Sequence, residues 1–535
     1  STYGMFEGCT NLTSVSLSST VGRVDGRTFR GCPALESILV HPSNPILSSV
    51  DGVVYTSNLK TLVKWPNGKP GSLQLPDTVT KIEGAAFYQC AKLTSVTIPE
   101  GVLTIEDYFG TPSYCCEDLA CGYLGTFEGC ASLTSVTIPS TVHQIDPNSF
   151  RSCIALESIS VAPSNPDFTS ADGALFNEAM TVLLVYPSEK EGSYTVPNSV
   201  EVISDGAFLN CSKLTQISLP NGLSSIGDEA FSHCVSLTSV AIPDSVASLG
   251  KRVFSGCSGL DTVELGNGIT SIEEGSFRGC TSLTSLAIPE GIVSISRFDE
   301  LSVPDYDDGA FKDCTGLVTI TLPESVAFIG RGTFKGCTSL KSFIVPAGVP
   351  YLLDGTFHGC TGLKSTLFLG DFTKIYSPQQ VFVDVADEFT VYYLAGRSGF
   401  ASEEWAPYST VMLDSPPSAL RLWSLENGFS LDADLNQDVN GDGISLIMAY
   451  ALNLDPGGAI AEHLPSASLT SDGLVMTFYA SSPDIEYAVQ ASRDLQNWSS
   501  VGVNLSEIGP DGRRTAIVTR DSQEGYLRLE VKERQ

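Results

Sequence analysis

The sequence predicts a β-rich solenoid, a rod of stacked 23-residue coils with a parallel sheet, followed by a small all-β sandwich domain. Three observations predict this fold class. Twelve of the fifteen cysteines are regularly spaced, and seven of the gaps between them are 23 residues long. Each of the twelve lies in the same apolar motif. Residues 466–535 alternate apolar and polar positions between turn signals, as short strands do.

The repeated motif is Phe-x-x-Cys-x-x-Leu-x-x-Val/Ile-x-Leu/Ile/Val-Pro, and Phe231, Cys234, Leu237, Val240 and Ile242 illustrate it. Its end has the period of two that suits a short strand with one buried face. Proline cannot donate to a strand ladder, so it ends the strand. We expect the Phe-x-x-Cys part to form one tight helical turn. One unit cannot bury its own apolar face, so the units must stack.

The sequence also contains a second, longer repeat that spans several 23-residue units. The first three cysteines of the series recur 121 residues later; the pairs are Cys9 with Cys130, Cys32 with Cys153, and Cys90 with Cys211. Each copy contains one 58-residue gap in which Asn-Pro, at Asn44 and at Asn165, precedes Asp-Gly. This pattern indicates tandem duplication of a block of several coils.

These units resemble the BspA-type leucine-rich repeats of bacterial and protist surface proteins. The match from Ala207-Phe208 through Cys211 and Leu214 to Leu219-Pro220 recurs about a dozen times. The resemblance implies a leucine-rich-repeat solenoid over residues 1–370, secreted or attached to the cell surface, which serves adhesion and partner binding without catalysis. Val-Tyr-Tyr-Leu segments close such solenoids in related proteins, and we assign residues 371–414 to a C-terminal cap on this resemblance.

The remaining residues divide into two predicted parts. Residues 415–460 read as a linker with an Asp/Asn-rich loop and a short helix over Ile444–Leu454. Residues 461–535 read as the β-sandwich module.

The repeated cysteines allow two interpretations, a metal or redox array and a column of small buried side chains. Free cysteine is among the most buried residue types, and the Cys-x-x-Cys spacing of structural zinc sites is absent, so we favour burial. Three cysteines lie outside the series, in an insertion: Cys115, Cys116 and Cys121. A disulfide from Cys121 to Cys115 or Cys116 would suit an oxidising compartment and leave the third thiol free or intermolecular.

The Asp/Asn-rich loop carries oxygen side chains at alternate positions: Asp434, Asn436, Asp438, Asn440 and Asp442. It resembles calcium loops of the EF-hand, dockerin or thrombospondin-repeat kind. The resemblance makes Asp438, Asn440 and Asp442 the first ligands, but Ala449 stands where the bidentate carboxylate belongs. Ca²⁺ would therefore need Asp434 or Asn436 as well. The alternative is an Asx-rich turn that caps the following helix. Ca²⁺ is the sole cofactor that we expect.

The net charge of −31, from 30 basic and 61 acidic residues, argues against nucleic acid as a partner and against anionic lipid. No apolar run approaches the ~20 residues that a membrane helix needs, so we expect no membrane insertion. The five histidines share no position in the repeat, and no common catalytic motif is present. We therefore do not expect an enzyme; an active site within residues 420–535 is the weakest of the hypotheses.

Two functional hypotheses remain for an extracellular or cell-surface protein. In the first, copies assemble head-to-tail into a filament or surface layer, because the sequence begins in mid-coil and leaves that coil's apolar residues uncovered. The expected interface consists of Met5, Phe6, Leu12, Val15 and Leu17. In the second, a monomeric adhesin binds a host or matrix protein or a glycan through its insertions. The outward strand positions are mostly Ser and Thr and lack the aromatic residues of a binding patch.

Overall fold

The computed structural model describes most of the repeat region and parts of the C-terminal region. The described residues are 5–25, 28–105, 108–109, 123–296, 308–373, 378–427, 429, 431, 433–437, 445–452, 465, 467–470, 473–482, 485–492, 499–501, 503–510, 512–518 and 526–533. The chain divides into two compact units. Unit 1 comprises residues 1–340, 346–362 and 372–385, and unit 2 comprises residues 341–345, 363–371 and 386–535.

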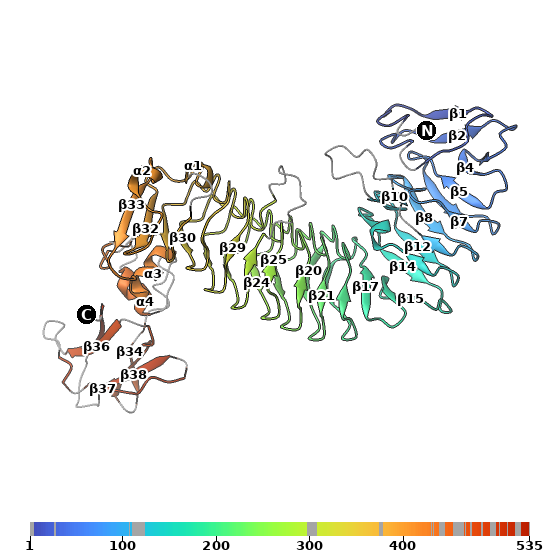
Figure 1. Cartoon of the computed structure of the whole chain (residues 1–535). Helices are drawn as coiled ribbons and strands as arrows, with labels where there is room; N and C mark the ends of the chain where they lie inside the picture. The colour runs from blue at the N-terminus through green and yellow to red at the C-terminus, as the bar shows by residue number, and fades with distance from the viewer. Residues whose placement is uncertain are drawn as a thin grey trace. The chain divides into compact units, whose positions relative to one another are not determined.

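Unit 1 is a solenoid whose coils contribute strands to two rows (Figure 1). The first row is β1 (Ser14–Leu17), β2 (Ser37–Val40), β6 (Gly71–Gln74), β8 (Leu93–Thr97), β12 (Ser135–Ile138), β14 (Ser158–Val161), β18 (Gly192–Thr195), β20 (Leu214–Ser218), β22 (Ser239–Ala241), β24 (Thr262–Glu264), β26 (Ser285–Ala287) and β28 (Thr319–Thr321). Neighbouring strands are parallel, and Ser135 lies opposite Ser158 one period later. The 23-residue period is therefore the coil length.

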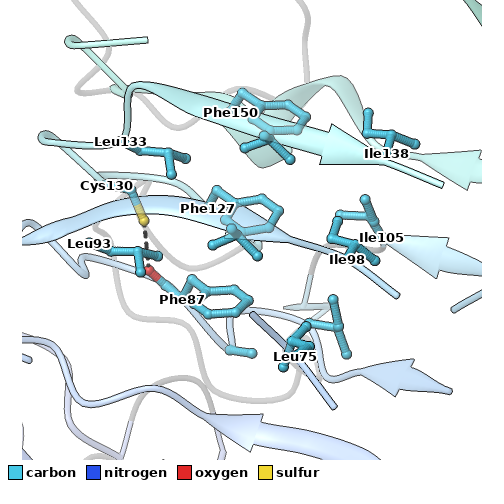
Figure 2. Packing of buried hydrophobic residues seen from close by; sticks show 14 of the residues in the cluster. Leu75, Phe87, Leu93, Ile98, Ile105, Phe127, Cys130, Leu133, Ile138 and Phe150 are labelled. Carbon is cyan, nitrogen blue, oxygen red and sulfur yellow. Dashed lines mark hydrogen bonds between the residues drawn. The ribbon is translucent and has the colours of Figure 1, made fainter. Parts of the chain in front are cut away.

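The second row consists of two-residue strands from the Val-x-x-Ile part of the repeat. They are β7 (Lys81–Ile82), β9 (Thr104–Ile105), β13 (Gln144–Ile145), β19 (Val202–Ile203), β21 (Ser225–Ile226), β23 (Ser248–Leu249), β25 (Ser271–Ile272), β27 (Ser294–Ile295) and β29 (Phe328–Ile329). The apolar core lies between the rows. Phe87, Phe127 and Phe150 stack through it, with ring centroids 4.9 and 5.4 Å apart (Figure 2). Aromatic stacking of this kind adds to the stabilisation from burial itself.

Both 58-residue gaps contain a three-stranded antiparallel meander. The first is β3 (Leu47–Val50), β4 (Val53–Thr56) and β5 (Thr61–Lys64); the second is β15 (Phe168–Ala171), β16 (Ala174–Asn177) and β17 (Val182–Val185). The last strand of each pairs in parallel with the next coil, through β7 and β19. The two copies of the duplicated block thus repeat in structure as well as in sequence.

The prediction of a tight helical turn at Phe-x-x-Cys was wrong for most coils. These segments are hydrogen-bonded turns, and the 3-10 helix η3 (Pro147–Phe150) ends at the phenylalanine where such a segment begins. The second residue after the phenylalanine has a positive φ, 62° at Asn210 and 61° at His233, which ends a helix. The N–H groups of these turns donate to the next coil instead, as from Asn210 to the Ser232 carbonyl at 2.9 Å.

Unit 2 begins with a parallel sheet of four strands, β30 (Ser342–Val345), β31 (Ser365–Phe368), β32 (Thr390–Leu394) and β33 (Ser409–Leu413). Its helices are α2 (Ser402–Trp405), α3 (Ala419–Glu426) and α4 (Leu446–Ala451), whereas α1 (Pro378–Val381) belongs to unit 1. Leu425 of α3 packs on the sheet against Leu367 and Tyr392. None of the helices in the described part of the chain is long and apolar enough to span a membrane.

The C-terminal module contains two antiparallel sheets, in agreement with the predicted β-sandwich. One has the order β34 (Ala467–Thr470), β35 (Gly473–Tyr479), β38 (Arg513–Val518) and β37 (Val503–Leu505), and the other pairs β36 (Ile485–Ser492) with β39 (Tyr526–Glu533). Met476, Phe478 and Val489 form its core together with Leu452, which follows α4. The domain boundaries predicted at 370, 414 and 460 stay predictions.

Candidate functional site

The repeated cysteines form a column of buried thiols inside the core of the solenoid. Eleven of the twelve are buried and Cys9 is exposed, and all twelve are free thiols. Nearly every buried sulfur donates to the carbonyl oxygen of the phenylalanine in the coil before it. Cys130 reaches the Phe87 carbonyl at 3.1 Å, and Cys257 reaches that of Phe231 at 3.0 Å (Figure 2). The sequence favoured burial but did not reveal this hydrogen bond.

Burial also determines the chemistry of these thiols. Desolvation raises the pKa of Cys90 to about 11 and that of Cys153, Cys314 and Cys360 to about 12. Because the thiolate is the nucleophile and the metal ligand, thiols that stay protonated at neutral pH are unsuited to both roles. The column is therefore a structural feature of the core.

The insertion cysteines Cys115, Cys116 and Cys121 lie outside the described residues, so the predicted disulfide stays a prediction. The described ends of this insertion are β10 (Tyr108–Phe109) and β11 (Tyr123–Leu124), which pair antiparallel. The insertion follows β9, and the second insertion, around residues 298–308, follows β27 at the equivalent place in its coil. Both insertions therefore leave unit 1 at the same edge of the coil.

The proposed calcium loop is described only in part. Asp434 accepts a hydrogen bond from the Asn436 N–H at 3.0 Å, which is an Asx turn, and Ile447 N–H donates to the Leu435 carbonyl at 2.9 Å. The remaining candidates, Asp438, Asn440 and Asp442, lie outside the described residues. Among those described, no group of three or more His, Cys, Asp or Glu side chains is suited to a metal ion.

The five residues of the expected assembly interface all belong to the first coil. Met5 is 60% exposed, Phe6, Leu12 and Val15 are half-buried, and Leu17 is buried. Phe6 stacks on Phe29 of the second coil with ring centroids 5.4 Å apart. The equivalent residues of a middle coil, Phe231, Leu237 and Val240, are buried. One side of the first coil thus packs on its neighbour, while its apolar residues stay partly accessible.

Two buried asparagines, which the sequence singled out only as part of the Asn-Pro pattern, anchor the meanders. Asn165 Nδ2 donates to the carbonyls of Pro139 and Val142, at 2.8 and 2.9 Å, and its Oδ1 accepts from the N–H groups of Asp167 and Phe168. Asn44 makes the same four contacts in the first copy. One amide therefore satisfies four backbone groups.

A buried lysine was not expected at all. Lys64 Nζ donates to the carbonyls of Ala85 and Tyr88, and Asn67 Nδ2 donates to the same Tyr88 oxygen at 3.0 Å. In regular coils the corresponding carbonyl receives an N–H from the coil before it, as Ser232 does from Asn210. The meander has no such turn, so two side chains supply donors instead. Burial lowers the pKa of Lys64.

The repeat region matches the profile of the BspA type leucine rich repeat region, in 6 copies, over residues 2–63, 67–111, 123–183, 185–299 and 300–383. The chain belongs to the BspA-type leucine-rich-repeat family. Proteins built of such repeats are generally non-enzymatic binding or structural proteins, typically at the cell surface. Family membership thus favours a non-enzymatic surface or adhesin role. No curated protein matches this BspA-type chain.

Several solved structures are similar to this BspA-type protein. A leucine-rich repeat protein from Eubacterium ventriosum shares 20% identity, with a TM-score of 0.43, over 71% of this chain and 78% of its own. A leucine rich cell surface protein from Faecalibacterium prausnitzii shares 24%, with a TM-score of 0.38, over 67% and 80%. The pneumococcal vaccine antigen PcpA shares 18%, with a TM-score of 0.41, over 75% and 80%.

Proposed function

We propose that the chain is a non-enzymatic extracellular structural protein whose copies associate head-to-tail into a filament or surface layer. The observation that supports this proposal is the accessible first coil, where Met5 is 60% exposed and Phe6 and Val15 are half-buried. In a solenoid each coil fits the next, so partly exposed apolar residues such as these suit a further coil-like surface. A heterologous contact of this kind repeats without closing on itself.

Sedimentation velocity of the 535-residue chain over a range of concentrations tests the proposal. We expect the mass to rise with concentration, and Met5→Asp and Val15→Asp to keep the chain monomeric. Val293→Asp is the matched control, because Val293 is 50% exposed on a coil in the middle of the solenoid. A wild-type chain that stays monomeric at high concentration contradicts the proposal.

The second candidate is a monomeric adhesin that binds a protein or glycan through the two insertions. The observation that favours it is their common edge, after β9 and after β27. Binding loops are commonly placed together on a rigid scaffold. Deletion of residues 110–122 should then abolish binding to a ligand found by array screening, whereas Val293→Asp should leave that binding intact. Binding that survives this deletion would argue against the adhesin.

We also propose Ca²⁺ as the ligand of the loop that contains Asp434 and Asn436, on the chemistry of its alternating carboxylate and amide oxygens. Ca²⁺ should raise the melting temperature of unit 2, and Asp434→Ala should reduce the increase. Mg²⁺ at the same concentration is the control, since it prefers water-rich octahedral sites. Equal melting temperatures with Ca²⁺ and with chelator would contradict this assignment.

A further inference from the structure

β33 is an edge strand of its sheet and lacks the features that usually prevent strand addition (Figure 1). It pairs with β32 over five residues in regular register, and no strand in the described residues pairs with its other edge. Val411 and Met412 are 40% and 54% exposed. Ser409–Leu413 contains no charged residue, proline or bulge, which are the usual protections of an exposed edge.

The backbone polarity of β33 can be assigned from one hydrogen bond. The Leu413 carbonyl accepts from the Ala395 N–H of the β32 side at 2.8 Å. Because backbone groups alternate sides along a strand, those of Leu413 and Val411 face β32. The N–H and C=O groups of Thr410 and Met412 therefore face the open edge. An extended segment can exchange hydrogen bonds with groups arranged in this way.

Both faces of this sheet are covered beside β33, so the edge is its accessible part. Met412 lies opposite Tyr393 of β32, whose ring stacks on that of Phe400 with centroids 4.6 Å apart. On the other face, Val411 lies opposite Tyr392, which packs against α3. The two exposed apolar side chains therefore flank the edge, one on each face. A strand added there would cover both with apolar residues of its own.

Carboxylates lie beside the open edge. Asp414 follows β33 directly, and Glu403 belongs to α2, which contacts β33. Both side chains are exposed, and neither pairs with a cation among the described residues. Residues 386–414 contain five acidic residues and one basic residue, Arg397, which pairs with Asp371 at 3.9 Å. The surroundings of the edge therefore suit a basic partner.

We propose that β33 binds an extended, basic segment of a partner protein, which joins the open edge as a further strand. The segment pairs with the outward groups of Thr410 and Met412, covers Val411 and Met412 with apolar residues, and places a lysine or arginine near Asp414. Cross-strand pairs of opposite charge stabilise such a ladder. A second copy of the chain suits this edge less, because two acidic caps would meet. The contact is independent of head-to-tail association.

Fluorescence anisotropy of a labelled peptide, Lys-Lys-Thr-Val-Val-Thr-Lys-Lys, tests this contact on the 535-residue chain. The peptide sequence reads the same in both directions, so it suits either strand orientation. Met412→Pro removes an outward N–H and leaves the pairing with β32 in place, and we expect it to weaken binding about tenfold. Met412→Ala is the matched control, because it keeps the N–H and should weaken binding only about threefold. Asp414→Asn should weaken binding about threefold.

Other outcomes overturn the inference in distinguishable ways. Equal binding to the wild type and to Met412→Pro would place the peptide elsewhere on the acidic surface. Undiminished binding of a peptide with N-methylated valines would refute strand addition, and equal binding of a peptide with glutamate for lysine would refute a basic partner. No binding to the wild type would refute the inference and leave head-to-tail association standing.

Sedimentation velocity of the same variants separates a second copy from a partner protein. Dimers of the wild type that disappear in Met412→Pro would show that a second copy occupies the edge, and would overturn the inference. If the melting curve shows that Met412→Pro does not fold, Met412→Lys serves in its place, since an edge lysine opposes strand addition.

Discussion

At the scale of single residues, each buried thiol of the solenoid meets a carbonyl oxygen of the coil before it. Cys234, Cys280 and Cys337 donate over 3.1 to 3.3 Å to the carbonyls of Phe208, Phe254 and Phe311. Each of those oxygens also accepts a backbone N–H within its own turn, as Phe208 does from Cys211 at 3.1 Å, so the thiol supplies a second donor to the same oxygen. Cysteine supplies both a small apolar volume and a weak donor, which serine or alanine would supply only in part.

Alkylation of the native chain should modify Cys9 and spare the eleven buried cysteines of the column. Cys9 is exposed, whereas the buried sulfurs are inaccessible and their pKa values are raised. Peptide mapping by mass spectrometry after iodoacetamide at pH 8 measures the pattern, and treatment in denaturant is the control. Rapid modification of Cys257 in the native chain would contradict the described core.

Alkaline pH should destabilise unit 1. Desolvation raises the pKa of Cys90 to about 11 and of Cys153 to about 12, from the ordinary 9.0 of the unfolded chain. The raised values mean that the thiols' contribution to stability is complete below pH 9 and is lost as pH rises toward 12. The denaturant midpoint should therefore be lower at pH 10 than at pH 8, and Cys153→Ala should make the difference smaller. Equal denaturant midpoints of the wild type at pH 8 and pH 10 would refute the predicted destabilisation.

At the scale of elements, the meanders depend on the asparagine that precedes each. Asn165→Ala should lower the free energy of unfolding by about 2–3 kcal/mol, because it leaves buried backbone groups without partners. In the same variant the hydrogen-exchange rates of the Asp167 and Phe168 amides should increase, since both N–H groups donate to Asn165 Oδ1. Asn198→Ala, at an exposed position, is the matched control. Unchanged exchange in Asn165→Ala would disprove the role.

The period, the strands and the inward positions could be predicted from sequence, because Leu-x-x-Val-x-Ile specifies one buried face wherever it recurs. The turn at Phe-x-x-Cys could not, since its positive φ falls on residues as different as Asn210, His233 and Gly256. Lys64 escaped prediction because its partners are backbone carbonyls 21 and 24 residues away. Of the candidate sites, the first-coil residues were placed together, while Asp438, Asn440, Asp442 and the insertion cysteines lie outside the described residues.

At the scale of the whole molecule, the acidic charge opposes any association between copies. The chain carries −31, so two copies repel over distances comparable to the Debye length of about 10 Å at 0.1 M salt. Residues 5–24 contain one acid, Glu7, and one base, Arg23, so this part of the chain adds little to the repulsion. The same net charge argues against nucleic acid as a partner.

Salt should therefore strengthen assembly. At a fixed protein concentration we expect a larger mass in 0.5 M than in 0.02 M sodium chloride, because screening weakens repulsion between acidic surfaces and leaves the apolar contact intact. Light scattering across a salt titration measures this, and the Val15→Asp variant gives the baseline. Dissociation at high salt would instead indicate a contact made between opposite charges.

The meanders have a mechanical consequence. Each coil of unit 1 contacts mainly its immediate neighbours, so a force that pulls on the ends of the polypeptide would unfold the coils one after another. At Phe168–Val185 the next strands to separate are antiparallel, and Asn165 hydrogen-bonds to the Pro139 and Val142 carbonyls of the coil before it. A larger force is therefore needed to unfold the meander, and the two duplicated blocks would unfold as separate events. A single-molecule trace of this protein should show a pause at each meander.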